Sequence, residues 1–346
     1  MIRPVFVIGT VPELVKASPI IYAAYKLQSD AVIFLTGQHS VSRMVELCAN
    51  LGLKDVQVLA SESALEPHSS RSSSGTSRII GDFDVVVVTG DTRSALLGAT
   101  AGYDLGVPVV HLEAGLRLSE ISEPEESIRR RISKLTSVHV TPGAQQTHNL
   151  ITEGCSAARI DTAWEFSRLS LGYRANLGER RFLTDTWRPA SKWITTVHRV
   201  SNLRRLEKVA QFLVSFSRLL EVSLSIVRRP DTRLASFYQV LESHKITLID
   251  PWMPVDSEAV MRSFDGVVTD SAGLQQECAL LGVRSCILRK EVELYRKAPQ
   301  QLLAGNLDLS RLNRLSALSR APGLTFGYEG WLDESQRIWR SVCCMF

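Results

Sequence analysis

The segment DVVVVTG at residues 84–90 decides the fold, because its valines run on without alternating with polar residues. A strand that is apolar on both of its faces must be covered on both, which is typical of a parallel sheet flanked by helices. The chain therefore predicts an α/β fold. Similar runs, each followed by a turn and a helical stretch, lie at 4–9, 31–37, 107–113, 137–142, 192–197, 224–228, 245–250, 266–270 and 284–288.

These runs form two successive arrays, which predicts two Rossmann-like, doubly wound domains. The periodicity breaks within 162–190, and we place the first domain at 1–165 and the second at 166–330. Residues 331–346 have the pattern of an amphipathic helix, and we expect this helix to pack back on the first domain. Ligands of such folds bind beyond the carboxyl ends of the strands, so the cleft between the two domains is the expected site.

The composition is that of an ordinary globular enzyme. The 346 residues include 40 lysines and arginines against 36 aspartates and glutamates, and the net charge of +4 does not indicate a nucleic-acid partner. The six cysteines lack zinc-binding spacing, so we expect free thiols in a reducing cytosol and no metal. Neither a signal peptide nor an apolar run of roughly 20 residues is present, so we expect a cytoplasmic protein without membrane association.

The segment EPHSSRSSSGTSR at 66–78 stands apart, because it is rich in serine and nearly devoid of apolar side chains. Such a segment cannot bury enough surface to offset its ordering entropy, so we expect a mobile loop. The chain contains neither a GxGxxG nor a Walker A sequence, which excludes the two common phosphate-loop signatures as the basis of its function.

Polar residues gather where the predicted strands of the first half end. The stretch GTVPELVK at 9–16 is a simple helix start, or an anion site formed by helix amides and Lys16. In TGQHS, Gln38 and His39 are expected to be exposed. Asp91 of GDT either caps the next helix or acts in catalysis, and the sequence leaves both open.

Carboxylates are concentrated between the fourth and fifth of these runs. Glu113 of HLEAGLR ends a buried strand, where it either pairs with Arg117 or has a pKa raised by desolvation, and we interpret it as functional. Ser122 and Glu125 have capping-box spacing, which by itself makes Glu125 a helix cap. The remaining carboxylates are interpreted as charges of the loop and the helix start: Glu120, Glu123 and Glu126.

The second half carries candidate phosphate-binding groups. His198 and Arg199 follow one predicted strand, and Ser271 and Gly273 follow another. Small residues let a ligand approach the backbone, and the free amides at a helix start favour phosphate. Glu277, further along that helix, either accepts hydrogen bonds from sugar hydroxyls or is a solvated charge. The chain thus predicts a phosphorylated ligand across the cleft, with acid–base chemistry on the first domain.

In this order, the motifs resemble those of the UDP-N-acetylglucosamine 2-epimerase family. The resemblance runs from residue 5 to about 310, and the ordered set is specific although each member alone is weak. The motifs are GTVPE with Lys16, TGQH (36–39), GDT (90–92), HLEAGLR (111–117), PEE (124–126) with Arg129 and Arg130, HRVSN (198–202) and DSAGLQQE (270–277).

The resemblance implies a glycosyltransferase-B-like fold that binds a UDP-sugar and needs no metal or redox cofactor. Non-hydrolysing members interconvert UDP-GlcNAc and UDP-ManNAc, eliminating UDP across C1–C2 to a 2-acetamidoglucal and adding it back with C2 inverted. Because the C2 proton is poorly acidic, a base and leaving-group stabilisation must act together. The family also implies a homodimer.

The resemblance also assigns roles to individual positions. Asp91, Glu113 and Glu125 match the acid–base carboxylates, and His198 matches the phosphate-contacting histidine of the catalytic set. Ser271 matches a phosphate-binding position and Glu277 a ribose-binding one. The full set of implied substrate-binding residues is Lys16, Arg117, Arg199, Ser271, Gly273 and Glu277. In some bacterial members a second UDP-GlcNAc acts as an allosteric activator near the positions of Gln38 and His39.

The chain also departs from the family pattern around the ligand. The arginine of GTRPE is Val11 and the glutamate of HRxEN is Ser201, while further family segments are replaced at 161–166, 227–230 and 293–296. Retained acids with a changed binding rim predict a divergent epimerase in a dedicated pathway, for instance of antibiotic or polysaccharide biosynthesis. The alternatives are a hydrolysing epimerase that releases ManNAc and UDP, a UDP-sugar transferase of the same fold, and a non-catalytic UDP-sugar sensor.

Overall fold

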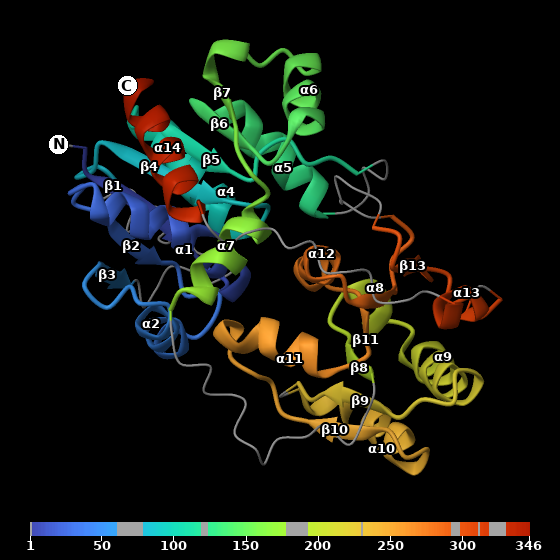
Figure 1. Cartoon of the computed structure of the whole chain (residues 1–346). Helices are drawn as coiled ribbons and strands as arrows, with labels where there is room; N and C mark the ends of the chain where they lie inside the picture. Colours follow the sequence, from blue (N-terminus) through green and yellow to red (C-terminus); the bar gives the residue numbers. More distant parts are fainter. Residues whose placement is uncertain are drawn as a thin grey trace. The chain divides into compact units, whose positions relative to one another are not determined.

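The computed structural model contains two compact units (Figure 1). One comprises Met1–Leu177 with Gly327–Phe346, and the other comprises Gly178–Phe326. Each has one parallel sheet, so the predicted α/β class with two doubly wound sheets is confirmed. The serine-rich segment 66–78 lies outside the described residues, which are 2–60, 79–118, 124–177, 193–229, 231–291, 298–310, 312–317 and 330–346.

The sheet of the first unit has seven strands in the order β3-β2-β1-β4-β5-β6-β7. The order reverses between β1 and β4, which pair in parallel with Pro4 opposite Val85. Such a reversal is the switch point of a doubly wound sheet, beyond which ligands of these folds bind. The strands are β1 (Pro4–Ile8), β2 (Val32–Leu35), β3 (Gln57–Ala60), β4 (Val85–Thr89), β5 (Val109–Leu112), β6 (Val138–Thr141) and β7 (Ile160–Thr162).

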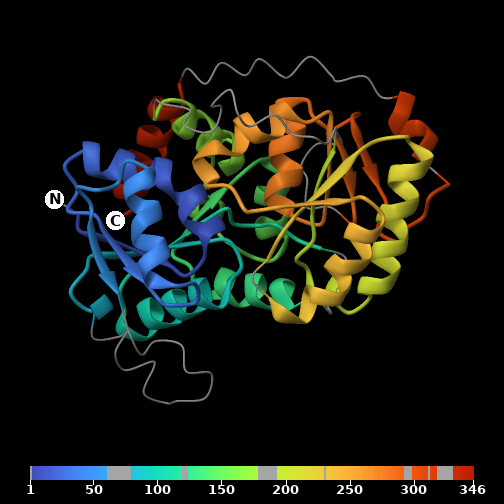
Figure 2. The ribbon, with the colours of Figure 1, turned by 90° about the horizontal axis from the view of Figure 1, so that it is seen from below.

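Helices cover both faces of this sheet, with α7 and α14 on one face and α4 and α5 on the other (Figure 2). Helix α1 packs against both α7 and α14, while α4 packs against α5. The helical elements are α1 (Val11–Lys26), α2 (Val41–Asn50), α4 (Arg93–Leu105), α5 (Pro124–Leu135), α6 (Ala144–Thr152), η1 (Ala157–Arg159), α7 (Phe166–Ala175) and α14 (Trp331–Cys344).

Helix α4 lies very close to the sheet because glycines face the strands. A Cβ on Gly98 would come within 2.9 Å of Val7, and one on Gly102 within 2.7 Å of Val109. The valines of β4 next to them are completely buried. This close packing brings the N-terminus of α4, and the turn that precedes it, against the end of the sheet.

The C-terminal helix α14 belongs to the first unit. Trp339 is 1% exposed, packs against the ring of Phe6 in a tilted arrangement and donates a hydrogen bond from Nε1 to Ser29 Oγ at 3.0 Å. Trp331 packs its ring against Tyr173 of α7. The first unit therefore extends to Leu177 and does not end at the predicted residue 165, because α7 is packed between α1 and α14.

The second unit has a six-stranded parallel sheet in the order β10-β9-β8-β11-β12-β13, whose switch point lies between β8 and β11. Trp193 of β8 lies over Gly266 of β11, where a larger residue would clash with its ring. The strands are β8 (Trp193–Thr196), β9 (Leu224–Val227), β10 (Thr247–Ile249), β11 (Gly266–Thr269), β12 (Arg284–Ile287) and β13 (Gln301–Leu303). The helical elements are α8 (Val200–Leu203), α9 (Leu206–Leu219), η2 (Thr232–Leu234), α10 (Ala235–Ser243), η3 (Pro254–Asp256), α11 (Ser257–Ser263), α12 (Ala272–Leu281) and α13 (Leu312–Ala317).

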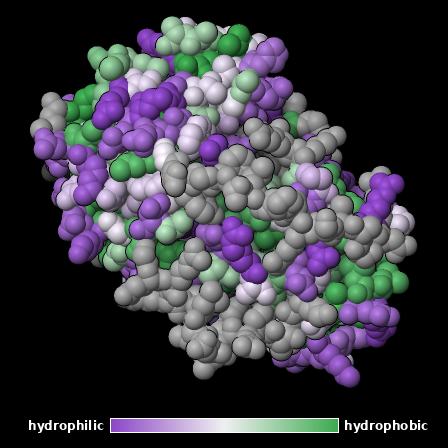
Figure 3. Space-filling model, viewed as in Figure 1, coloured by the Kyte–Doolittle hydropathy of each residue, from purple (hydrophilic) through white to green (hydrophobic). Residues whose placement is uncertain are grey.

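The described surface mixes polar and apolar side chains. Figure 3 shows one face on which hydrophilic residues are interspersed with smaller hydrophobic groups. Within the described ranges, no helix has the length and apolar character needed to cross a membrane.

Candidate functional site

The turn formed by Gly90, Asp91 and Thr92 follows β4 at the switch point of the first sheet. Thr92 is the N-cap of α4, because its hydroxyl accepts a hydrogen bond from the Ala95 amide at 3.1 Å. The alternative that Asp91 caps this helix is therefore wrong. The carboxylate of Asp91 instead binds Arg129 of α5 and is 28% exposed, which leaves it accessible to solvent.

His111 of β5 supports the same turn from the sheet. Its ring is 1% exposed, and its Nε2 lies 2.7 Å from the carbonyl oxygen of Gly90. Burial lowers the pKa of His111 to about 3, so the ring is neutral near pH 7. Nε2 must then carry the proton that it donates to the carbonyl. No sequence pattern indicated this support, because His111 occupies an ordinary position within a strand.

Glu13 of α1 supports the turn from the opposite side. Its carboxylate accepts hydrogen bonds from the amides of Gly9 at 2.8 Å and Thr10 at 2.7 Å, and from the hydroxyl of Thr92. With Thr10 it completes a capping box, so the predicted helix start is confirmed. Burial raises the pKa of Glu13 to about 7, although these hydrogen bonds oppose the rise.

Glu113 lies at the end of β5 with only 3% of its side chain exposed. Both of its oxygens bind Lys16 Nζ, at 2.8 and 2.6 Å, which joins two residues 97 positions apart. Its backbone has φ of 63°, a left-handed conformation that non-glycine residues rarely adopt. Such strain costs roughly 1–3 kcal/mol and is concentrated at functional sites. Glu113 thus combines a buried, ion-paired carboxylate with a strained backbone, and both features support its functional interpretation.

Arg117 forms its ion pair with Glu153, whereas Glu113 is paired with Lys16. Its Nε and Nη2 bind the two oxygens of Glu153 at 2.8 and 2.6 Å, and Nη2 also donates to Ser133 Oγ at 3.0 Å. This bidentate arrangement holds the pKa of Glu153 below its usual value. Arg117 thus fixes the segment after β5 to α5 and to the residue that follows α6.

Glu125 occupies the first turn of α5 and is partly exposed. Its Oε2 is buried without a hydrogen-bond partner among the described residues. A buried carboxylate oxygen without a partner is costly, and such an atom is a candidate to receive a ligand group. Ser122, the other half of the predicted capping box, lies outside the described residues.

The interpretation of Glu126 from the sequence, as a charge of the helix start, is wrong. Its side chain is 0% exposed and forms ion pairs with Arg129 at 3.4 Å and Arg130 at 3.0 Å. The prediction failed because the first turn of α5 packs inward beside the arginines that follow it. The signal in the sequence was the spacing of Arg129 and Arg130, which follow Glu126 by three and four residues and can therefore pair with it on a helix.

Gln38 and His39 follow β2 and are exposed, as predicted. Gln38 Oε1 accepts a hydrogen bond from Ser94 Oγ at 2.7 Å, which links it to α4. His39 Nδ1 accepts a hydrogen bond from the Val11 amide at 3.2 Å. Val11, which replaces the family arginine, therefore keeps a backbone contact at this edge although it offers no cation.

In the second unit, Asp270 organises the loop after β8. Its side chain is 0% exposed, and it accepts hydrogen bonds from the amides of His198 and Arg199 and from Asn202 Nδ2 at 2.9 Å. His198 Nδ1 lies 2.8 Å from Asp270 Oδ1. Burial by itself would raise the pKa of Asp270, but the hydrogen bond and charge of His198, with Asn202 and Arg199, hold it below its usual value.

This arrangement determines which nitrogen of His198 is available to a ligand. Because Nδ1 donates to Asp270, Nε2 is the ring nitrogen left for a ligand, and the side chain is 44% exposed. Arg229 Nη1 also binds the His198 carbonyl at 3.3 Å. Arg229 lies in the segment 227–230 that departs from the family pattern, so the replacement still supports the histidine loop.

The N-terminus of α12 follows β11 directly. Ser271 is its N-cap and accepts a hydrogen bond from the Leu274 amide at 3.3 Å, which leaves its own proton for a ligand. Among the described residues beyond its own helix backbone and chain neighbours, the nearest atom to a Cβ on Gly273 would be Ser271 Oγ at 3.9 Å, so packing against them does not require glycine there. Glu277 is 9% exposed and accepts a hydrogen bond from Ser257 Oγ at 2.8 Å, so the alternative of a solvated charge is wrong.

Two further segments depart from the family pattern, at 161–166 and at 293–296. In the segment 161–166, Asp161 binds Arg337 of α14 at 3.1 Å, and Trp164 stacks under Arg168 at 3.7 Å. The Asp161–Arg337 contact ties the segment to α14, and the Trp164–Arg168 contact ties it to α7. The segment 293–296 lies outside the described residues.

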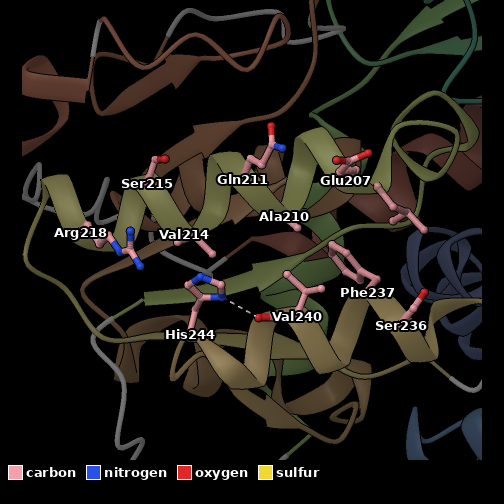
Figure 4. Close-up of a pocket in the computed structure, with 11 residues that line it drawn as sticks. Glu207, Ala210, Gln211, Val214, Ser215, Arg218, Ser236, Phe237, Val240 and His244 are labelled. Carbon is pink, nitrogen blue, oxygen red and sulfur yellow. Dashed lines mark hydrogen bonds between the residues drawn. The ribbon is translucent and has the colours of Figure 1, made fainter.

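A cavity of about 530 Å³ lies between α9 and α10 in the second unit (Figure 4). Apolar side chains such as Val214, Phe237 and Val240 line it together with polar ones, and Arg218 and His244 lie at one end. His244 is tied back to the Val240 carbonyl at 2.9 Å. No sequence-predicted site residue lines this cavity, so it is separate from the candidate site.

In the part of the chain that the structure describes, no group of three or more histidine, cysteine, aspartate or glutamate side chains is arranged to hold an ion. The cysteines are free thiols, and burial raises the pKa of Cys286 to about 12, so that thiol is protonated and a poor metal ligand.

Comparison with known proteins places this geometry in a family. A family model described as UDP-N-acetylglucosamine 2-epimerase matches residues 24–305. The UDP-N-acetylglucosamine 2-epimerase of Methanocaldococcus jannaschii is 27% identical over 309 residues, covering 83% of each chain. That of Bacillus subtilis is 25% identical over 316 residues, covering 88% of this chain and 82% of its own.

Solved structures give the same fold. The M. jannaschii UDP-GlcNAc 2-epimerase in complex with UDP-GlcNAc and UDP has a TM-score of 0.83 at 24% identity, with 99% of both chains covered. The UDP-GlcNAc 2-epimerase of Neisseria meningitidis bound to UDP-GlcNAc has a TM-score of 0.79 at 21% identity, covering 99% of this chain and all of its own. With the match over 24–305, this chain belongs to the UDP-N-acetylglucosamine 2-epimerase family, whose members are isomerases.

Proposed function

We propose that this protein interconverts UDP-GlcNAc and UDP-ManNAc without hydrolysing them, by anti elimination and re-addition of UDP. The observation that carries the proposal is the pair of carboxylates at neighbouring strand ends, each with its own buried or half-buried cation. Glu113 binds Lys16, and Asp91 binds Arg129. Removal of a weakly acidic proton needs such placed acid–base groups.

The reaction has two steps. In the first, a carboxylate takes the proton from C2 while the C1–O bond breaks, and its electron pair leaves with the β-phosphate of UDP. This gives 2-acetamidoglucal, with a double bond between C1 and C2. In the second, UDP adds back at C1 while a proton is delivered to the other face of C2. The cycle is redox-neutral, so it needs no redox cofactor.

The first unit supplies the acid–base groups. Asp91, Glu113 and Glu125 share the transfer of the C2 proton, and Lys16 and Arg117 bind the substrate. Lys16 pairs with the buried Glu113, where an unpaired carboxylate would be costly. The partnerless Oε2 of Glu125 supports a role for that residue beyond a helix cap.

The second unit binds the nucleotide. His198 and Arg199 contact the diphosphate, and Asp270 orients the ring of His198 through Nδ1 so that Nε2 is left to bind the leaving phosphate oxygen. The amides at the N-terminus of α12, with Ser271 and Gly273, bind the same phosphates. Glu277, buried beside Ser257, accepts hydrogen bonds from the ribose hydroxyls.

Incubation with UDP-GlcNAc in deuterated water tests this function. Nuclear magnetic resonance should detect UDP-ManNAc and deuterium at C2, and absence of both would refute the proposal. Free ManNAc with UDP would identify a hydrolysing epimerase. Binding of UDP without turnover would identify a sensor, the alternative favoured by Val11. Glu113→Gln should abolish turnover while UDP binding persists, whereas Glu46→Gln on the exposed face of α2 serves as the matched control.

The proposal extends to the setting of the enzyme. It acts as a homodimer in the cytoplasm within a dedicated biosynthetic pathway, for instance of antibiotics or polysaccharides. Gln38 and His39 contribute to a second, activating UDP-GlcNAc site, supported by their exposure beside the first unit's switch point. Light scattering tests the dimer, and a sigmoidal dependence of rate on UDP-GlcNAc that Gln38→Ala abolishes tests the activating site.

A further inference from the structure

Glu126 lies at the centre of a buried ionic cluster, with 0% of its side chain exposed. Its Oε2 accepts hydrogen bonds from the Leu118 amide at 3.1 Å and from Arg129 Nη1 at 3.4 Å. Its Oε1 lies 3.0 Å from Arg130 Nε and 3.9 Å from Arg117 Nε. A carboxylate is tolerated in such a place only when it is paired, and these cations meet that requirement.

Arg129 divides its guanidinium between two carboxylates. Nη2 binds Asp91 and Nη1 binds Glu126, while the arginine side chain is only 3% exposed. A planar guanidinium held through two of its nitrogens cannot rotate without weakening one of the two ion pairs. Glu126, three residues earlier on α5, therefore fixes the direction from which Arg129 meets Asp91.

The Leu118 amide connects Glu126 to the segment that follows β5. That segment begins with Glu113 and ends with Leu118. The buried carboxylate of Glu126 therefore contacts both this segment and Arg129, the residue that binds Asp91. Glu153 offers a comparison within the same cluster. It binds Arg117 at 2.6 Å and Arg130 at 3.2 Å, but it is 28% exposed.

We propose that Glu126 is a positioning residue for the reaction, which acts through Arg129 on Asp91 and rests on the function proposed above. A reacting group displaced by about 1 Å can lose about 100-fold in rate. Glu126→Gln keeps the shape of the side chain but removes its charge, so Arg129 loses this charged anchor. We expect kcat to fall by roughly 10- to 100-fold and KM to change less than about threefold, because the nucleotide is bound by other residues.

The test measures kcat and KM for UDP-GlcNAc, with each rate referred to the folded fraction from circular dichroism. Glu153→Gln is the matched control, and its kcat should stay within about threefold of wild type, because its ion pairs go to Arg117 and Arg130 and lie off the path from Glu126 through Arg129 to Asp91. A merely structural role of Glu126 would lower the folded fraction and leave kcat per folded molecule unchanged. In an Asp91→Asn background, adding Glu126→Gln should not reduce C2 deuterium exchange further, and a full additional loss would overturn the inference.

A second variant keeps the test decisive if Glu126→Gln fails to fold. Glu126→Gln with Arg130→Gln removes one charge of each sign, and Arg130 is 40% exposed against 3% for Arg129. The double variant should show the same loss of kcat, whereas Arg130→Gln alone should show little. If wild type turns over and the Glu126 variants keep its kcat, the inference is wrong. If wild type does not turn over, the proposed function fails and the inference fails with it.

Discussion

Glu13 makes the stability of the first unit depend on pH in the direction opposite to that of an ion-paired carboxylate. Burial raises its pKa from 4.5 to about 7, against the opposing hydrogen bonds of Thr92, Gly9 and Thr10. Between these two values the native state binds more protons than the unfolded state. The stability contributed by protonated Glu13 is therefore fully present below pH 4.5 and is lost as the pH rises through about 7.

The magnitude follows from the size of the rise, which corresponds to roughly 3 kcal/mol. Little of it is screened by solvent, because Glu13 is only 3% exposed. Glu13→Gln cannot ionise, so its unfolding free energy lacks this contribution. The glutamine amide next to the Gly9 and Thr10 amides adds a cost, but that cost does not vary with pH. As the pH rises from 4.5 to neutral or above, the unfolding free energy of the variant minus that of wild type should therefore increase by roughly 3 kcal/mol.

Urea unfolding of wild type and Glu13→Gln at a series of pH values measures this difference, followed by circular dichroism. Glu153→Gln is a control of opposite sign. Hydrogen bonds from Arg117 lower the pKa of Glu153, so its contribution is present above the unfolded pKa and is lost as the pH falls. The reasoning would be refuted if the difference in unfolding free energy between wild type and Glu13→Gln stayed constant with pH or changed in the other direction. Either result would show that burial does not outweigh the hydrogen bonds.

Two further predictions concern the C-terminal helix and the histidine loop. Trp339→Ala should lower the unfolding free energy of the first unit by about 3–5 kcal/mol, because its ring is 1% exposed and packs against Phe6. Urea unfolding measures it, and a loss below about 1 kcal/mol would contradict this packing. Asp270→Asn should weaken UDP binding about tenfold or more by calorimetry, because His198 loses a charged hydrogen-bond partner. Unchanged affinity in a folded variant would exclude that role.

The fold was predictable where strands are buried on both faces, whereas of the four edge strands only β10 was indicated by an apolar run. The valine run predicted β4, and the similar runs predicted the other central strands. The short strands β3, β7 and β13 were not recognised, because an edge strand needs no continuous apolar run. In β3 all four residues are at least partly exposed. The boundary at 165 was misplaced because Tyr173 and its helix neighbours are buried by contacts with distant α1 and α14.

Within the site, positions were easier to predict than partners. Glu113 at a strand end was recognisable because neither capping nor solvent explained a carboxylate there. Its partner was not, since Lys16 lies 97 residues away and only the sheet order brings the two together. Glu126 was misjudged for a related reason. A charge in the first turn of a helix is usually solvated, and only the packing of α5 against the end of β5 buries it.

The three residues of the turn after β4 show why the retained and the changed positions of this chain have different consequences. Gly90 is held by His111, Asp91 by Arg129 and Thr92 by Glu13, so three separate elements fix one acid from behind. Val11, by contrast, contributes only its backbone amide, at the exposed edge beside His39. A change at that edge alters what the substrate touches and leaves the acid in place. We therefore expect the divergence at this position to alter KM, or the choice of sugar, more than kcat.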